Sequence, residues 1–233
     1  MQTLRGLIEA SPHPFPVHLV TKGKLSDRAL TMKTTKDGRK FSPTDIPFFT
    51  RNDDGSQGKI TNRGCTRDYK LDPILKMARR LGEVPRKKKE GNQIHVVQWI
   101  GISLDEIYRM KPSRDWWAKS VWPLVDMRMT RHDCKRWMAE HGYPEPPRSS
   151  CVYCPYHSDH EWRRLRDEEP EDFAKAVAFE RRLQEVKRES SNFSTTPFLH
   201  RSLVPLDQVD FSTDEEKGQG NLFNAECFGM CGV

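Results

Sequence analysis

The sequence predicts an α/β protein with a parallel sheet, and three observations carry this prediction. Residues 94–102 form a nearly continuous apolar run, which is typical of a strand covered on both faces in a parallel sheet. Ser103 and Glu106 follow at once and match an SxxE capping box, so a helix is predicted to begin directly after the strand. Apolar residues recur at helical spacing over residues 71–81 and Gly82 follows them, which predicts a helix before the strand.

The first part of the chain contributes further elements. Leu4, Leu7 and Ile8 predict the end of a helix, and the alternating apolar residues within 15–20 predict a short strand. Residues 21–64 are polar, basic and rich in glycine, so we expect a long mobile loop insertion there.

The second half of the chain is predicted to be helical. One helix is expected over residues 131–141, ending at Gly142, and another over residues 170–187. A stretch rich in proline, residues 143–147, links the first of these helices to Cys151.

These elements divide the chain into three parts. Residues 1–125 are expected to form a partial α/β domain that carries the insertion at 21–64. Residues 126–209 are expected to form a helical region rich in cysteine, and residues 210–233 a flexible tail with a CxxxC pair.

Composition favours a soluble cytoplasmic protein with an anionic partner. The 233 residues include no run of about 18 apolar residues, and Glu9 lies where a signal peptide needs its apolar stretch. We therefore expect no membrane segment. The net charge of +6 fits a nucleotide or nucleic-acid partner. The basic run Arg86–Lys89 could contact phosphates, although a solvated loop is the first interpretation.

Cysteine spacing predicts a metal centre. The six cysteines would stay reduced in the cytoplasm, which favours metal or redox chemistry over disulfides. Cys151 and Cys154 form a CxxC loop, and Cys134 and Cys65 are the two further candidate ligands. Cys65 precedes a predicted helix, whose positive end favours thiolate. Closing the long loop from Cys65 to Cys134 costs about 4 kcal/mol, whereas a structural metal site returns about 10–16 kcal/mol.

Two kinds of metal suit four thiolates, and a second ligand set competes with them. Softness alone does not separate a four-iron four-sulfur (4Fe-4S) cluster from tetrahedral zinc. Cys151, Cys154, His157 and His160 also follow a CxxCxxHxxH pattern with the atoms that zinc needs. That spacing is poor for zinc, because only two residues separate the two ligand pairs. Thiols without any metal are the third alternative.

Three segments together resemble the phosphoadenosine phosphosulfate (PAPS) reductase family. The segments are Arg63-Gly-Cys65-Thr-Arg-Asp-Tyr69-Lys70, Trp99-Ile-Gly101-Ile-Ser103-Leu-Asp105-Glu106 with Arg109, and Ser150-Cys151-Val-Tyr-Cys154-Pro155. The family belongs to the adenine-nucleotide alpha-hydrolase group of Rossmann-like folds. The chain is similar in particular to a phage and bacterial branch that shares its cysteines with the sulfur-activating enzyme of DNA phosphorothioation. That resemblance implies a 4Fe-4S cluster on Cys65, Cys134, Cys151 and Cys154.

The resemblance also implies roles for other residues. Lys70 and Arg109 match positions near an adenine nucleotide, ATP or PAPS, or its phosphosulfate; without a nucleotide they are a solvated lysine and a helix-pair residue. Cys227 and Cys231 loosely match the Glu-Cys-Gly motif whose cysteine attacks sulfur. An extra metal or disulfide pair, or no role, are the alternatives for these two tail cysteines.

One family feature has no counterpart in the sequence. The nucleotide-binding loop of the family is a Ser-Gly-Gly-x-Asp-Ser turn after the first strand, and Gly55-Ser-Gln-Gly58-Lys59 has no strand before it. We therefore expect an N-terminally truncated family member, explained by a start codon assigned too far downstream, by another polypeptide that completes the site, or by loss of catalysis.

The expected function is that of a PAPS reductase-like iron–sulfur oxidoreductase or sulfurtransferase of sulfur metabolism, with nucleic acid as a candidate target. The rival functions are a zinc-stapled nucleic-acid-binding module and a catalytically inactive scaffold.

Overall fold

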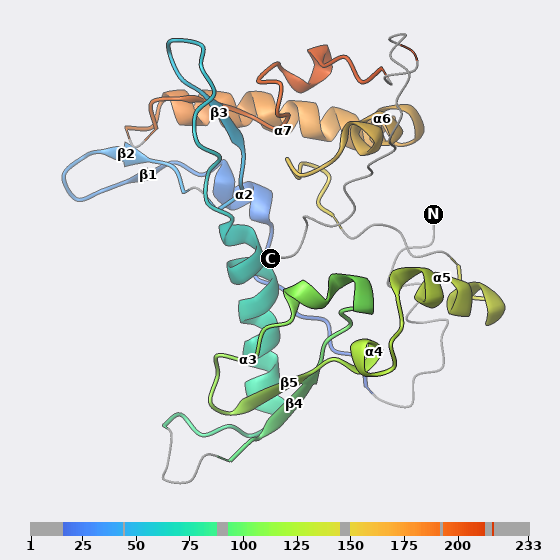
Figure 1. Ribbon diagram of the computed structural model, residues 1–233. Coiled ribbons are helices and arrows are strands. Elements are labelled where there is room, and N and C mark those ends of the chain that lie inside the picture. The colour runs from blue at the N-terminus through green and yellow to red at the C-terminus, as the bar shows by residue number, and fades with distance from the viewer. Residues whose placement is uncertain are drawn as a thin grey trace.

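The computed structural model describes residues 16–43, 45–87, 93–144, 150–191, 193–212 and 216. These residues form a mixed α/β structure (Figure 1). The helices are α2 (Leu25–Ala29), η1 (Thr66–Leu71), α3 (Asp72–Leu81), η2 (Leu104–Arg109), α4 (Pro123–Asp126), α5 (Arg131–Glu140), α6 (Asp159–Glu168), α7 (Pro170–Arg188) and η3 (Leu206–Gln208). The strands are β1 (Lys33–Thr34), β2 (Lys40–Phe41), β3 (Phe49–Arg51), β4 (Val96–Trp99), β5 (Ala118–Val121) and β6 (Thr196–Phe198).

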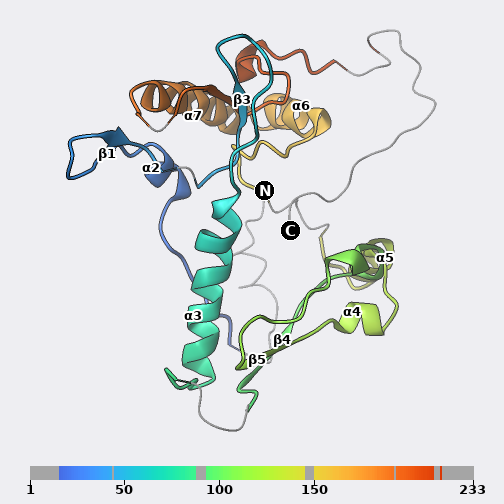
Figure 2. The same ribbon diagram turned by 60° about the vertical axis from the view of Figure 1, so that its left-hand side comes forward.

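The elements gather in two places that α3 connects. Figures 1 and 2 agree that β3, α6 and α7 lie together at one end of the molecule, while β4, β5, α4 and α5 lie at the other. Helix α3 runs from the first group to the second. Among the described residues the strands pair two by two: β1 with β2, β3 with β6, and β4 with β5.

The predicted parallel sheet is present as one strand pair. Strand β4 pairs with β5 in parallel, with Val96 opposite Ala118. The prediction of a strand covered on both faces is wrong for the described part of the chain, because Val97 is 54% exposed and Trp99 is 78% exposed. In this part of the structure β4 alternates between half-buried and exposed residues, as a strand with one packed face does.

The predicted capping box after β4 does not form. Ser103 makes no side-chain cap bond, and the Glu106 carboxylate instead accepts a 2.5 Å hydrogen bond from Arg109 Nη1. The turn that follows is the short 3-10 helix η2 rather than an α-helix. Two capping boxes that the sequence analysis missed do form, at Thr130 before α5 and at Ser158 before α6.

The helix before β4 is confirmed, with a wider turn at its start. Pro73 has no N–H to donate to the carbonyl of Tyr69, and its ring would crowd that carbonyl in a regular α-helix. The preceding turn η1 is wound as a π-helix, which relieves the crowding. At the other end, α3 stops at Gly82, where a Cβ would lie 2.5 Å from Val96 Cγ2. The missing side chain lets the end of α3 pack against β4.

The segment 21–64 differs from the predicted loop insertion. It carries α2, β1, β2 and β3, and β3 pairs antiparallel with β6 so that Phe49 faces Phe198. Ile46 and Phe48 are buried in the main hydrophobic cluster. This segment has few apolar residues, but they are buried against residues of the second half of the chain. Local sequence patterns do not reveal such distant contacts.

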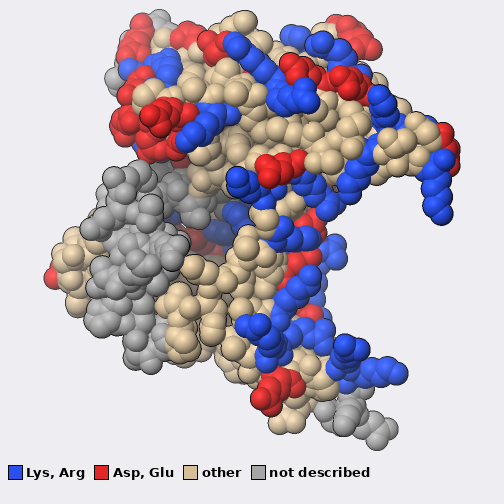
Figure 3. Space-filling view, turned by 180° about the vertical axis from the view of Figure 1, so that it is seen from behind, with Lys and Arg blue, Asp and Glu red and all other residues tan. Residues whose placement is uncertain are grey.

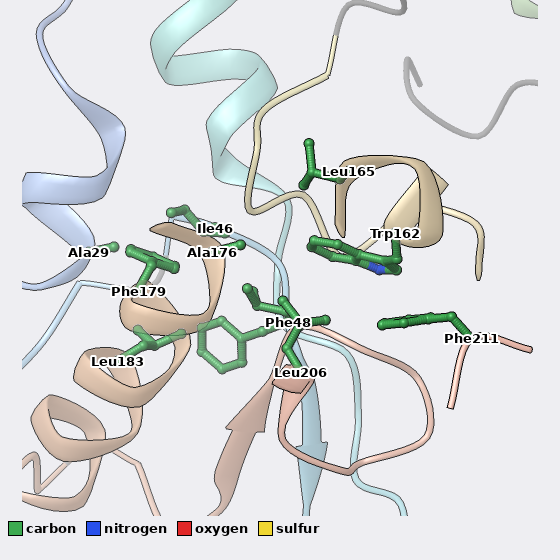
Figure 4. Packing of buried hydrophobic residues seen from close by; sticks show 11 residues of the cluster. Ala29, Ile46, Phe48, Trp162, Leu165, Ala176, Phe179, Leu183, Leu206 and Phe211 are labelled. Carbon is green, nitrogen blue, oxygen red and sulfur yellow. The ribbon is translucent and has the colours of Figure 1, made fainter. Parts of the chain in front are cut away.

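The main hydrophobic cluster packs around α7 (Figure 4). Its members come from α2, the segment before β3, α6, α7 and the chain around η3: Ala29, Ile46, Phe48, Trp162, Leu165, Ala176, Phe179, Leu183, Leu199, Leu206 and Phe211. Helix α7 confirms the predicted helix at 170–187.

Two charged residues of α7 are buried beside this cluster. Glu180 is 1% exposed, and its two carboxylate oxygens accept 2.7 Å hydrogen bonds from the backbone N–H groups of Leu199 and Leu206. Burial raises the pKa of that carboxyl. Lys187 Nζ donates to the carbonyls of Ser42 at 3.1 Å and Pro43 at 3.0 Å. Burial lowers the pKa of the Lys187 ammonium to about 8.

Some expectations concern residues that the structure does not describe. The predicted helix end at Leu4, Leu7 and Ile8 and most of the tail 210–233 lie outside the described residues. Within the described ranges, no helix combines the length and apolarity that crossing a bilayer requires.

Gly82→Ala tests the packing of α3 on β4. The new methyl group would meet Val96 at 2.5 Å, so we expect the free energy of unfolding to fall by about 1–3 kcal/mol. Gly101→Ala is the matched control, because no non-adjacent atom of the described residues lies within 4 Å of its added Cβ. Urea denaturation followed by tryptophan fluorescence measures both. Equal stability of the two variants would contradict this account of the α3–β4 contact.

Candidate metal centre

The CxxC segment forms a tight turn before α6. The N–H of Cys154 donates to the carbonyl of Cys151 at 2.9 Å, and Nε2 of His157 lies 2.9 Å from the same oxygen. Since a carbonyl oxygen can only accept, Nε2 carries the proton of this bond. The two bonds close the turn from both sides and fix the spacing between the two cysteines.

The two residues between the cysteines anchor the turn to the core. Val152 and Tyr153 pack against the main hydrophobic cluster, and the Tyr153 ring stacks on Phe179 of α7 with centroids 4.4 Å apart. Burial raises the pKa of the Tyr153 hydroxyl. With its middle residues held by the core, the turn leaves Cys151 exposed and Cys154 half-buried.

Cys65 reaches the same place from the other side. It is the residue before η1, and its backbone N–H donates to the carbonyl of Asp45 at 2.7 Å. This bond ties the start of η1 to the segment that leads into β3. The thiol is half-buried.

Cys65, Cys151 and Cys154 line one cavity of about 240 Å³. It lies between η1 and the loop that leads into α6, both visible in Figure 1. Two cationic side chains, Arg63 and Lys70, also line the cavity, and no Asp or Glu is among the described residues that line it. Three tyrosines share the lining: Tyr69, Tyr153 and Tyr156. The combination is a thiol-rich, cationic and partly aromatic site.

Cys134 is not among the residues that line the cavity. It lies in α5, where burial raises the pKa of its thiol and the carboxylates of Asp105 and Asp133 raise it further. Asp105 Oδ1 accepts the N–H of Arg131 at 2.8 Å, which fixes η2 to the start of α5. The structure therefore brings together three of the four predicted ligands and leaves the fourth beside η2.

The donor set of the cavity fits a soft metal. Its three thiols are ligands for zinc or an iron–sulfur cluster, and the described lining holds no hard carboxylate. Across the described ranges, no three Cys, His, Asp or Glu side chains already lie at metal-binding geometry. A metal would have to draw the thiols closer, as expected where metal binding is coupled to folding.

The histidines of the CxxCxxHxxH pattern have different environments. His157 uses Nε2 on the Cys151 carbonyl, places Nδ1 3.5 Å from Glu161 Oε2, and packs edge-on against Trp162. His160 is exposed on α6. His157 thus holds the turn together through the atoms that a zinc ligand would need.

The other predicted site residues are distributed as follows. Lys70 is exposed and lines the cavity. Arg109 is not in the lining and pairs with Glu106 within η2. Cys227 and Cys231 lie outside the described residues.

Sequence reasoning missed Arg63, Tyr69 and Tyr156 as site residues. The Arg63 guanidinium lies 5.0 Å from the centre of the Tyr156 ring, which orders both side chains at the cavity. Arg63 and Tyr69 lie in the segment around Cys65 that resembles the PAPS reductase family, and the sequence signal for Tyr156 is that it follows Cys154 by two residues.

The variant His157→Ala tests whether His157 is a structural residue or a zinc ligand. Loss of the bond to Cys151 and of the contact with Trp162 should lower the free energy of unfolding by about 1–3 kcal/mol while metal content stays unchanged. His160→Ala is the control and should change neither. Urea denaturation and metal analysis of the purified variants measure these effects. Loss of metal on either substitution would support the zinc pattern instead.

Comparison of the chain with protein-family models, with curated proteins and with solved structures found no match.

Proposed function

We propose that this chain is a PAPS reductase-like iron–sulfur protein that acts as an oxidoreductase or sulfurtransferase in sulfur metabolism. The observation that carries the proposal is the cavity that Cys65, Cys151 and Cys154 line together with Lys70. Soft ligands and a cation in one cavity suit a redox centre placed beside an anionic substrate. The motif resemblance supports the same combination.

The proposed cofactor is a 4Fe-4S cluster with Cys134 as the fourth ligand. Residues of α5 would have to approach the cavity for this, since Cys134 lies beside η2 in the structure. Zinc is the alternative metal for the same thiols. The role of His157 in closing the turn supports the thiol set over the CxxCxxHxxH set.

The proposed substrate is an adenine nucleotide, ATP or PAPS, held by Lys70 and Arg63. Both cations line the cavity, and Arg63 presents a planar fork suited to phosphate or sulfate oxygens. Arg109 is a weaker candidate here, because Glu106 already neutralises it. We further propose that the parallel pair β4 and β5 belongs to a Rossmann-like sheet.

In this proposal the residues of the chain position the reactants. When bound, an iron–sulfur cluster supplies one-electron transfer. Lys70 and Arg63 bind and orient the anion next to the thiols. Tyr153 packs against the main hydrophobic cluster and so holds the CxxC turn against the core, and Pro155, which follows the turn, is buried.

Surface charge supports an anionic macromolecule as a further partner. Lys and Arg side chains gather along the side of the molecule that α3 occupies (Figure 3). That helix contributes Lys76, Arg79 and Arg80. Such a stripe suits the phosphates of nucleic acid, and a partner subunit with a matching acidic surface is the other candidate.

Anaerobic purification tests the proposed cluster. We expect a brown protein with about four iron and four sulfide per chain. Cys65→Ser, Cys151→Ser and Cys154→Ser should each lose most of that iron, and Cys134→Ser should lower it if α5 supplies the fourth ligand. Ser150→Ala, a neighbour of the CxxC turn, is the control. Stoichiometric zinc in a colourless protein would overturn the iron–sulfur assignment.

Nucleotide titration tests the proposed anion site. Lys70→Ala should weaken the binding of ATP or PAPS roughly tenfold, because it removes a cation that lines the cavity. Lys76→Ala is the matched control, since Lys76 is exposed on α3, which continues η1, and does not line the cavity. Isothermal titration calorimetry measures both. Absence of saturable binding in the unaltered protein would favour the inactive scaffold.

A further inference from the structure

A chain of hydrogen bonds links a serine, a histidine and an aspartate away from the cysteine cavity. Ser202 Oγ lies 2.7 Å from His200 Nδ1, and His200 Nε2 lies 3.0 Å from Asp159 Oδ1. Ser202 and His200 follow β6, whereas Asp159 is the first residue of α6. Two segments that are distant in sequence therefore assemble a nucleophile, a base and a carboxylate that orients the base.

The hydrogen-bond partners of His200 determine its tautomer. The backbone N–H of Ser202 donates to His200 Nδ1 at 3.2 Å, so Nδ1 acts as an acceptor. In the neutral ring the proton then resides on Nε2, which donates to the Asp159 carboxylate. The Ser202 hydroxyl can donate to Nδ1, the atom that would remove its proton. This is the arrangement that activates a serine nucleophile.

The surrounding structure holds the base and leaves the serine accessible. His200 is 5% exposed and packs edge-on against Phe211, while Ser202 is exposed. Arg201 Nη2 donates to Asp159 Oδ2 at 2.8 Å, which fixes the second carboxylate oxygen. The hydrogen bond from His200 lowers the pKa of the Asp159 carboxyl, and Arg201 adds to this effect.

The turn around the serine is fixed from both ends. Glu180 of α7 accepts the N–H groups of Leu199 and Leu206, on either side of the turn. Between them Leu203 has a φ of 58°, a left-handed conformation that costs energy for a residue with a side chain. Backbone strain next to an activated hydroxyl is typical of a functional turn.

Two guanidinium groups border the turn. Arg201 is 66% exposed beyond its contact with Asp159. Arg51 Nη1 donates to the carbonyl of Leu203 at 3.3 Å, so this second cation lies next to the residue that follows Ser202. Asp159 already neutralises Arg201, so Arg51 is the cation beside the turn that favours a substrate with negative charge and that would also stabilise an oxyanion.

We propose that Ser202, His200 and Asp159 form a second catalytic site that hydrolyses carboxylic esters bearing a negative charge. Ser202 Oγ bonds to the acyl carbon as its proton passes to His200 Nδ1. The bond from that carbon to the ester oxygen breaks, and His200 returns the proton to the leaving alcohol. Water then attacks the acyl serine with His200 as base, which releases the carboxylic acid and restores Ser202. Asp159 is a positioning residue that acts through His200.

Labelling with a fluorophosphonate probe tests the nucleophile in the full-length protein. We expect stoichiometric modification, mapped by mass spectrometry to Ser202 and lost in Ser202→Ala. Ser212→Ala is the matched control, because Ser212 bonds to the carboxylate of Asp210 and has no imidazole partner in the structure described. Equal labelling of Ser202→Ala and the unaltered protein, or no labelling of Ser202, would overturn the proposal.

Ester hydrolysis tests the activity and the preference for charge. Mono-p-nitrophenyl glutarate should be hydrolysed with a several-fold higher kcat/KM than p-nitrophenyl acetate, and Ser202→Ala should reduce both rates by about a hundredfold or more. Arg51→Gln should remove most of the preference for the charged ester. Rates that are unaffected by Ser202→Ala would refute a site at Ser202.

The kinetic constants of Asp159 variants test whether Asp159 positions His200 or has only a structural role. Asp159→Asn should lower kcat by at least about tenfold with little change in KM, because the imidazole loses its orienting carboxylate. Asp159→Glu should restore part of kcat. If Asp159→Asn instead raises KM and leaves kcat unchanged, Asp159 does not act through His200. Each assay can be repeated in Cys151→Ser, so failure of the iron–sulfur proposal leaves this test unaffected.

Discussion

The burial of two charged side chains on α7 is the constraint on which most of the described structure depends. Glu180 and Lys187 are each 1% exposed, and an unsatisfied buried charge would cost several kcal/mol. Glu180 accepts backbone N–H groups of the turn after β6, and Lys187 donates to the Ser42 hydroxyl and to the carbonyls of Ser42 and Pro43. Two distant parts of the chain are thereby attached to one helix in fixed positions.

Both candidate sites are loops supported by this helix. The CxxC turn rests on α7 through the stacking of Tyr153 on Phe179, and the turn with Ser202 is held by Glu180. Loops can carry reactive groups with defined geometry when a rigid element fixes their backbone. The two sites differ in how complete they are. Ser202 and Asp159 already lie within hydrogen-bond distance of His200. The three cysteines share a cavity, but a metal would have to draw their thiols closer together.

The part of the molecule around β4 and β5 is built differently. The main hydrophobic cluster has no member there, and Val97 and Trp99 are exposed. A single strand pair is marginally stable by itself. The packing of α3 on β4 at Gly82 therefore contributes more to the stability of this part than the strand pairing does. Helix α3 directly continues η1, which follows Cys65, so η1 and α3 together connect the cysteine cavity to the parallel strands.

The sequence by itself determined the elements that local periodicity specifies: α3 with its end at Gly82, the strand at 96–99, α5 and α7. Cysteine spacing also identified Cys65, Cys151 and Cys154, which the structure brings to one cavity. Only the tertiary structure decided that segment 21–64 packs on α7 and β6, because pairing between residues so far apart leaves no local pattern. The same holds for Asp159 and His200, which neither spacing nor periodicity connects. Their contact exists because a buried carboxylate on a third element, Glu180, fixes the turn that carries the histidine.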